Sequence, residues 1–178
     1  EEKAAKLAEA EEAAKATRWL CAQGVDGCGA LAALLHKTDR ATGMAPTSLE
    51  GEWQAASGQL CALIAGASLS DCASRLPQGD IHMRNVIAPQ MLVPFAAAAA
   101  RQLGQPVTVA WDGCFVTTDG SGVASAEIPE TDLATTVTQI RDGAWLPGDE
   151  RQANRPVATN QSGGVNTAPS EQVIAILL

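Results

Sequence analysis

The sequence predicts an α+β fold, in which an N-terminal helical layer packs on a mainly antiparallel sheet of about four strands. Apolar residues recur at helical spacing up to residue 104, and from residue 105 onward they alternate with a period of two. Asp-Gly pairs then separate short alternating runs, which is typical of hairpin turns. We therefore expect one domain over residues 1–178, with a helical part (1–104), an antiparallel meander (105–143), and a loop with a terminal helix (144–178).

The first helix is predicted over residues 2–23. Its apolar stripe consists of small or aliphatic residues three to five positions apart, namely Ala5, Ala8, Ala13, Ala16, Leu20 and Cys21. Gly24 fits a left-handed cap that ends this helix. Asp26 fits the N-cap of a second helix over residues 28–37.

A third helix is predicted after the loop "TDRATGMAPT". Thr47 and Glu50 have the spacing of a capping box. The apolar face of this helix would consist of Leu49, Trp53, Ala56, Leu60 and Leu63 or Ile64. It would fade near "AGASLS", and Ser70 with Asp71 would start one further helical turn, "DCASRL".

A fourth helix is predicted from Pro89, which suits a first helical turn, to Gly104, which ends the apolar pattern. The residues of its buried face would be Met91, Leu92, Phe95, Ala99 and Leu103. Four strands follow, at "VTVAW", "CFVTT", "VASAEI" and "TTVTQI". The stretch "DERQANRPVATNQSGGVN" is predicted to be a loop, and "SEQVIAILL" the start of a terminal helix.

The first hairpin, Trp111-Asp112-Gly113-Cys114, is predicted to have a type I′ turn. That turn requires positive φ at both central residues, which glycine adopts freely and aspartate tolerates. Trp111 and Cys114 would then lie opposite each other on one face of the hairpin, shared with Val109 and Val116. We expect this face to pack on the helix that carries Leu92, Phe95 and Leu103.

Composition excludes some classes of function. The net charge of −8 disfavours nucleic-acid binding, because an acidic surface repels phosphates. No apolar run approaches the roughly 20 residues that span a bilayer. The five cysteines contain no C-x-x-C pair, so we expect reduced thiols and a cytoplasmic protein.

Two groups of residues could carry chemistry. The first is Cys21, Cys28 and His36, whose spacing does not match the close ligand pairs of structural zinc sites, so we expect packing in the core or on the surface and no metal. The second contains the catalytic candidates, which are of the types that build a Cys-His nucleophile. They are Cys61, Asp71, His82 and Arg84, with Cys72 nearby in the sequence.

No cofactor site is predicted. The glycines at 120–122 and 162–164 lack the Walker lysine and do not lie between a strand and a helix. The segment "GDIHMRN", which holds His82 and Arg84, is predicted to be a loop, where it would be solvated or would hydrogen-bond to the sheet. Arg151 and Arg155 could clamp an anion, but solvated loop arginines are the simpler interpretation.

Three stretches resemble a bacterial family of unknown function, the domain-of-unknown-function family number thirty-seven twenty-six. They are "AEEAAKATRWLCAQGVDG", "LCALIAGASLSD" and "PQMLVPFAAAAARQLGQPVTVAWDG", in this order. The resemblance covers roughly residues 9–114 well. It implies no activity and no catalytic residues.

Two functions remain open at this stage. The first is a non-catalytic accessory or oligomerising domain, acting as a homodimer or with a protein partner, because no catalytic set is assembled and an Ala-rich helical face suits close packing. The second is a small-molecule metabolic enzyme with a site near His82 that uses Cys61 or Asp71. A catalytic cysteine would react quickly with alkylating agents near neutral pH, and a packed one would not.

Overall fold

The computed structural model describes residues 2–123, 128, 130–134 and 138–143, with side chains from residue 9 onward. Its elements, in chain order, are α1 (Glu2–Ala22), α2 (Gly27–Thr38), β1 (Glu52–Trp53), β2 (Leu60–Cys61), α3 (Ala62–Asp71), the 3-10 helix η1 (Ala73–Gln78), β3 (Ile81–Met83), β4 (Val86–Ile87), the 3-10 helix η2 (Pro89–Leu92), α4 (Val93–Leu103), β5 (Val107–Trp111), β6 (Cys114–Thr118) and β7 (Thr138–Asp142). This combination confirms the predicted α+β class. The predicted terminal helix in 144–178 lies outside the described residues.

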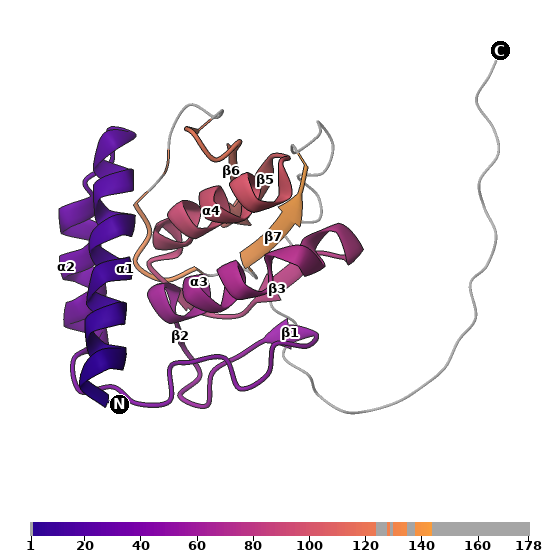
Figure 1. The fold of residues 1–178 in the computed structure, drawn as a ribbon. Helices are drawn as coiled ribbons and strands as arrows, with labels where there is room; N and C mark the ends of the chain where they lie inside the picture. The colour runs from indigo at the N-terminus through magenta and orange to yellow at the C-terminus, as the bar shows by residue number, and fades with distance from the viewer. Residues whose placement is uncertain (1, 124–127, 129, 135–137, 144–178) are drawn as a thin grey trace, which may run out of the picture.

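The helices form two groups. α1 and α2 run alongside each other at one end of the molecule, and α3 and α4 lie together against the sheet (Figure 1). α4 packs on β5 and β6, and α1 also contacts α3 and α4. Among the described residues, no helix combines the length and apolarity needed to cross a membrane.

The α1–α2 hairpin follows the sequence closely. Gly24 has a φ of 81°, as a left-handed cap requires. The Asp26 side chain caps α2 by accepting a hydrogen bond from the Gly29 amide at 2.8 Å. A Cβ at Gly27 would lie 2.5 Å from the Thr17 carbonyl oxygen, so only glycine lets the two helices approach so closely there.

The prediction of a helix that begins at Thr47 is wrong for residues 47–61. This segment forms loops, β1 and β2, and α3 begins only at Ala62. Thr47 does not cap a helix, because its hydroxyl donates to the Gln54 carbonyl at 3.0 Å. Gly51 and Gly58 both take positive φ, at 65° and 82°, which turns the chain back on itself. A helical spacing of apolar residues therefore arose from a turn-rich segment.

The later helical predictions are confirmed in outline. "DCASRL" falls largely within η1, and Pro89 begins η2. α4 ends at Leu103, where Gly104 forms a left-handed cap with a φ of 69°. The predicted buried face is buried at Met91, Leu92, Phe95 and Ala99, while Leu103 is half-buried.

The sheet differs from the predicted meander in its order and in one strand direction. Its five strands lie in the order β1-β3-β7-β5-β6, and β1 is parallel to β3 while the other pairs are antiparallel. A second, two-stranded sheet joins β2 to β4. Alternation in the sequence predicts a strand but not its partner, so β7 could not be placed on the far side of β5. Of the predicted strand at 123–128, only Val123 and Ile128 are described, and Val123 forms an isolated bridge with Thr118.

The "GDIHMRN" segment is not a loop at its centre, because Ile81–Met83 is strand β3. β3 lies between β1 and β7 and buries Ile81 and Met83 while His82 faces solvent. The strand is only three residues long, so its alternation is too brief to stand out from the flanking Gly79, Asp80 and Asn85.

The first hairpin is confirmed. Asp112 and Gly113 have φ values of 47° and 80°, and Trp111 pairs directly with Cys114. Val109 pairs with Val116, and both belong to the hydrophobic core with Trp111. Trp111 is fully buried, and its indole Nε1 donates to the Thr131 hydroxyl at 3.0 Å. The indole is therefore a structural element.

Candidate functional site

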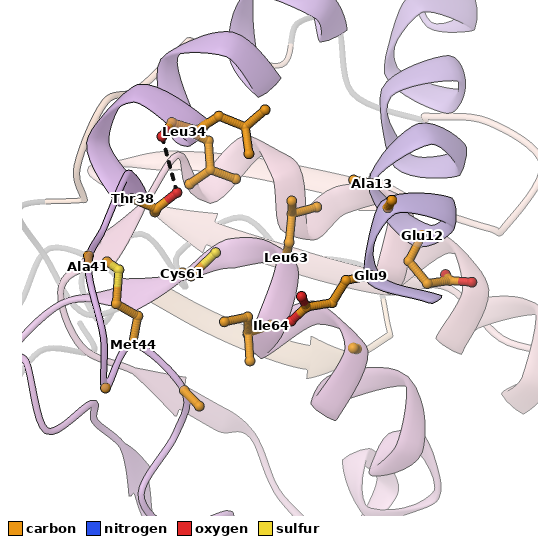
Figure 2. A pocket seen from close by; sticks show the side chains of 15 residues that line it. Glu9, Glu12, Ala13, Leu34, Thr38, Ala41, Met44, Cys61, Leu63 and Ile64 are labelled. Carbon is orange, nitrogen blue, oxygen red and sulfur yellow. Dashed lines mark hydrogen bonds between the residues drawn. The ribbon is translucent and has the colours of Figure 1, made fainter. Parts of the chain in front are cut away.

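One feature of functional interest is an apolar groove between α1, α2 and α3 (Figure 2). It encloses about 790 Å³ and is open on one side. Its lining residues are Glu9, Ala10, Glu12, Ala13, Leu34, Leu35, Thr38, Ala41, Gly43, Met44, Ala45, Cys61, Leu63, Ile64 and Ala67. Twelve of these fifteen residues are apolar or glycine, so the groove favours an apolar occupant.

The shape of the groove follows from the small residues on its walls. Ala10 and Ala13 stand on α1 where bulkier side chains would fill the space toward α3. Leu63 and Ile64 form the opposite wall and are half-buried. A wide apolar surface is thus left between helices that do not close on each other at this end.

Leu35 is the most conspicuous side chain of the groove. Among the described residues, two large apolar side chains are exposed: Leu35, at 54%, and Leu49, at 37%. Leu35 lines the groove and Leu49 does not. Leu34, its neighbour on α2, is fully buried in the core, so the apolar stripe of α2 is wider than packing within this chain requires.

The polar groups of the groove lie mainly on α1. Glu9 and Glu12 are exposed, and in Figure 2 the Glu9 side chain extends toward Ile64 of α3. Glu12 also accepts a hydrogen bond from Lys15 at 2.9 Å. Thr38 donates its hydroxyl to the Leu35 carbonyl at 3.4 Å, as the dashed line in Figure 2 marks. The rim is therefore acidic, and the interior lacks a set of converging polar groups.

Cys61, the first catalytic candidate, lines this groove. Its side chain is buried, and burial raises the pKa of its thiol above the ordinary value of 9.0. The charge of Glu9 acts in the same direction, while amide groups of Ile64 and Leu63 oppose it. The thiol therefore stays protonated at neutral pH and forms part of an apolar wall.

Asp71 lies far from Cys61 along the same helix. Cys61 precedes the first residue of α3 and Asp71 is the last, so about ten residues, or roughly 15 Å of helix, separate them. Asp71 is exposed. The structure does not bring this thiol and this carboxylate together.

His82 and Arg84 both lie next to Glu52, which was not among the site residues predicted from the sequence. Arg84 donates through Nε to Glu52 Oε1, and His82 lies directly opposite Glu52 across the β1–β3 ladder. The bond from Arg84 lowers the pKa of Glu52 despite its partial burial, and the nearby His82 lowers it further. Gln54 also donates to Glu52, at 2.9 Å. Recognising Glu52 would have required reading "EW" as a strand inside an apparently helical stretch.

Cys21 and Cys28 lie at the surface of the hairpin formed by α1 and α2. Both are exposed, whereas Cys21 was predicted to continue the apolar stripe of the first helix. Leu20, one position earlier, takes the core position with no exposure, which rotates Cys21 toward solvent. His36 is exposed in the last turn of α2. Within the described part of the chain, no three His, Cys, Asp or Glu residues are close enough to bind one metal ion.

The comparisons with known proteins bear on the same region of the chain. No curated protein and no solved structure gives a significant match. A family model does match part of the chain, from residue 5 within α1 to Cys61. This segment includes the residues of α1, of α2 and of the loop 41–45 that line the groove. Residues 5–61 match the model of the family described as "Protein of unknown function (DUF3726)", and the family resemblance predicted from the sequence is thereby confirmed over this segment.

Proposed function

We propose that this chain is a non-catalytic accessory domain that binds a protein partner through the groove between α1, α2 and α3. The occupant is an amphipathic segment of the partner, with apolar side chains in the groove and Lys or Arg at its flank. The observation that carries the proposal is the exposed Leu35 on a groove with apolar walls and an acidic rim.

The apolar part of the argument rests on the cost of leaving this surface in water. Burying apolar surface contributes about 25 cal/mol per Å². Leu35 is more than half exposed, although Leu34 beside it is fully buried, so a bound segment would remove the Leu35 side chain from water. Helical segments commonly dock such grooves through apolar residues at helical spacing.

The charge of the rim selects the chemistry of the partner. Glu9 and Glu12 stand on the α1 side, and the whole chain carries a net charge of −8. A basic flank on the partner would pair with these carboxylates and would be drawn toward an acidic surface. A second copy of this chain would bring its own Glu9 and Glu12 and the same net negative charge, so a basic partner fits better than a homodimer.

The groove suits a protein segment better than a substrate. Small-molecule sites usually add a few converging polar groups to an apolar pocket. Here the Cys61 thiol is protonated and the Thr38 hydroxyl donates to the Leu35 carbonyl. The carboxylates of Glu9 and Glu12 lie on the exposed side of α1. These contacts orient no reacting group, which disfavours the alternative of an enzyme using Cys61.

Two synthetic peptides test the proposal. Both form an amphipathic helix with the same leucine face, and one has lysines on the flanks while its twin has glutamates. We expect fluorescence anisotropy to show that the lysine peptide binds at least about tenfold more tightly, because only its flank complements Glu9 and Glu12. Equal affinity of the lysine and glutamate peptides would contradict the proposal that the acidic rim selects a basic partner.

A matched pair of variants locates the binding. Leu35→Glu places a charge in the groove, and Leu49→Glu places one at an exposed leucine outside it. Neither side chain belongs to the core, so both variants should fold. We expect Leu35→Glu alone to weaken the lysine peptide by about tenfold or more. Equal losses in both variants, or dimerisation of the free chain that is abolished by Leu35→Glu, would overturn the proposal of a separate partner.

A further inference from the structure

Two exposed cysteines lie on either side of the turn between α1 and α2. Cys21 lies in the last turn of α1, and Cys28 is the second residue of α2. Six residues separate them in the sequence, and the turn at Gly24 brings the two helix ends together. The other three cysteines, Cys61, Cys72 and Cys114, are buried or half-buried.

The turn places the start of α2 against Cys21. Gly24 and Val25 donate backbone hydrogen bonds to the Cys21 and Leu20 carbonyls, each at 3.1 Å, which folds the chain back over the end of α1. A Cβ on Gly27 would lie 3.1 Å from the Cys21 sulfur. The start of α2 is therefore packed directly against Cys21, and Cys28 is the next residue along.

We propose that Cys21 and Cys28 are a reversible dithiol–disulfide pair, a modification site at the tip of the α1–α2 hairpin. The oxidant is a small-molecule disulfide of the glutathione type. A thiolate of the pair attacks one sulfur of this disulfide, forms a mixed disulfide and expels one small thiolate. The second protein thiol, after losing its proton to solvent, attacks the protein sulfur and expels the other.

The exchange balances. Two protein thiols lose two electrons and two protons, and the small disulfide gains them as two small thiols. A small dithiol in excess reverses the reaction by the same steps. The inference is independent of the function proposed for the groove, because it requires neither the groove nor a partner.

The electrostatics of the pair agree with this assignment. The nearby Cys21 sulfur, through its charge and its hydrogen bond, raises the pKa of the Cys28 thiol, and the charge of Asp26 adds to the effect. A second thiolate is thus disfavoured next to a first one. Cys28 keeps its proton beside Cys21, where it can act as the second thiol of the exchange.

The test uses the purified full chain incubated with oxidised glutathione near neutral pH. Trypsin cleaves after Arg18 and Lys37, so both cysteines fall in one peptide, residues 19–37. We expect mass spectrometry to find this peptide lighter by two hydrogen masses. The peptide with the internal disulfide should exceed the glutathione-bound peptide by about tenfold or more, because the turn keeps the second cysteine close to the first.

Three serine variants serve as controls. Cys21→Ser and Cys28→Ser should each stop at the mixed disulfide, while Cys114→Ser, at a half-buried cysteine elsewhere, should still close the ring. If the unaltered chain stops at the mixed disulfide, as the single variants do, or forms only disulfides between chains, the pair is not a modification site and the inference is overturned.

Discussion

At the scale of single residues, Trp111 is one of the two largest fully buried side chains among the described residues. It is the last residue of β5, the strand between β7 and β6, and is fully buried in the core, with its indole nitrogen donating to the Thr131 hydroxyl. Trp111→Ala should lower the free energy of unfolding by about 3–5 kcal/mol, since it removes a large buried side chain and leaves a cavity. Urea unfolding measures the loss.

A second tryptophan provides the control for Trp111. Trp19 on α1 is only half-buried, so Trp19→Ala should cost clearly less. A loss below about 1 kcal/mol for Trp111→Ala would mean that the indole contributes little to packing, and the arrangement of the hairpin on α4 would be wrong.

The Glu52–Arg84 ion pair predicts a dependence of stability on pH. Arg84 holds the pKa of Glu52 below its ordinary value of 4.5. A depressed folded-state pKa means that the stabilisation is present above the unfolded pKa and disappears as the pH falls through the folded one. Glu52→Gln should therefore cost about 1 kcal/mol at pH 7, with the difference from the unaltered chain vanishing in acid.

Thermal unfolding over a pH series checks this prediction. Glu50→Gln, at an exposed carboxylate two residues away, should change stability little at any pH. If Glu52→Gln lowers stability by the same amount at neutral and at acidic pH, the charge of Glu52 does not contribute to stability.

At the scale of elements, α3 and α4 pack closely because Gly66 has no side chain. A Cβ there would lie 2.3 Å from a ring carbon of Phe95 on α4. Gly66→Ala should therefore destabilise the chain by about 1–3 kcal/mol, despite the better helix propensity of alanine, because Phe95 or the helix must move.

Gly79 is a matched site for the same substitution. It has an extended φ of 162°, and a Cβ there would meet nothing within 4 Å. Gly79→Ala should be close to neutral when both variants are unfolded in urea. If Gly66→Ala is equally neutral, the close contact of α3 with α4 does not constrain the fold.

Elements that local chemistry defines could be predicted from the sequence. The Gly24 and Asp26 caps, the Gly104 cap and the Asp112-Gly113 turn all depend on a residue and its immediate neighbours, and all are present. β1 and β3 could not be predicted, because strands of two and three residues have too short an alternation to detect. Their existence depends on pairing between distant segments.

The candidate sites show the same division. His82 and Arg84 were singled out by type, but their common neighbour Glu52 became visible only through the parallel pairing of β1 with β3. Cys61 was singled out as a thiol, and the fold shows it as one wall of an apolar groove. Burial and proximity are properties of the assembled chain, and one sequence does not specify them.

At the scale of the whole molecule, the chain separates a closed core from an open groove. α4 and the sheet bury nearly every apolar side chain between them, whereas α1, α2 and α3 leave Leu35 in solvent above an acidic rim. Burial of the exposed Leu35 would stabilise the groove, as the burial of leucines stabilises the core. This difference supports our proposal that a protein partner covers the groove.

Methyl NMR during titration with the lysine peptide tests that claim most directly. Methyl groups of Leu34, Leu35, Leu63 and Ile64 line the groove, and Leu49 and Leu92 do not. We predict shifts concentrated in the first set, with Leu49 and Leu92 unchanged. No shifts in the groove, or shifts centred on Ile81 and Met83 beside His82, would contradict the account and favour a site on the sheet.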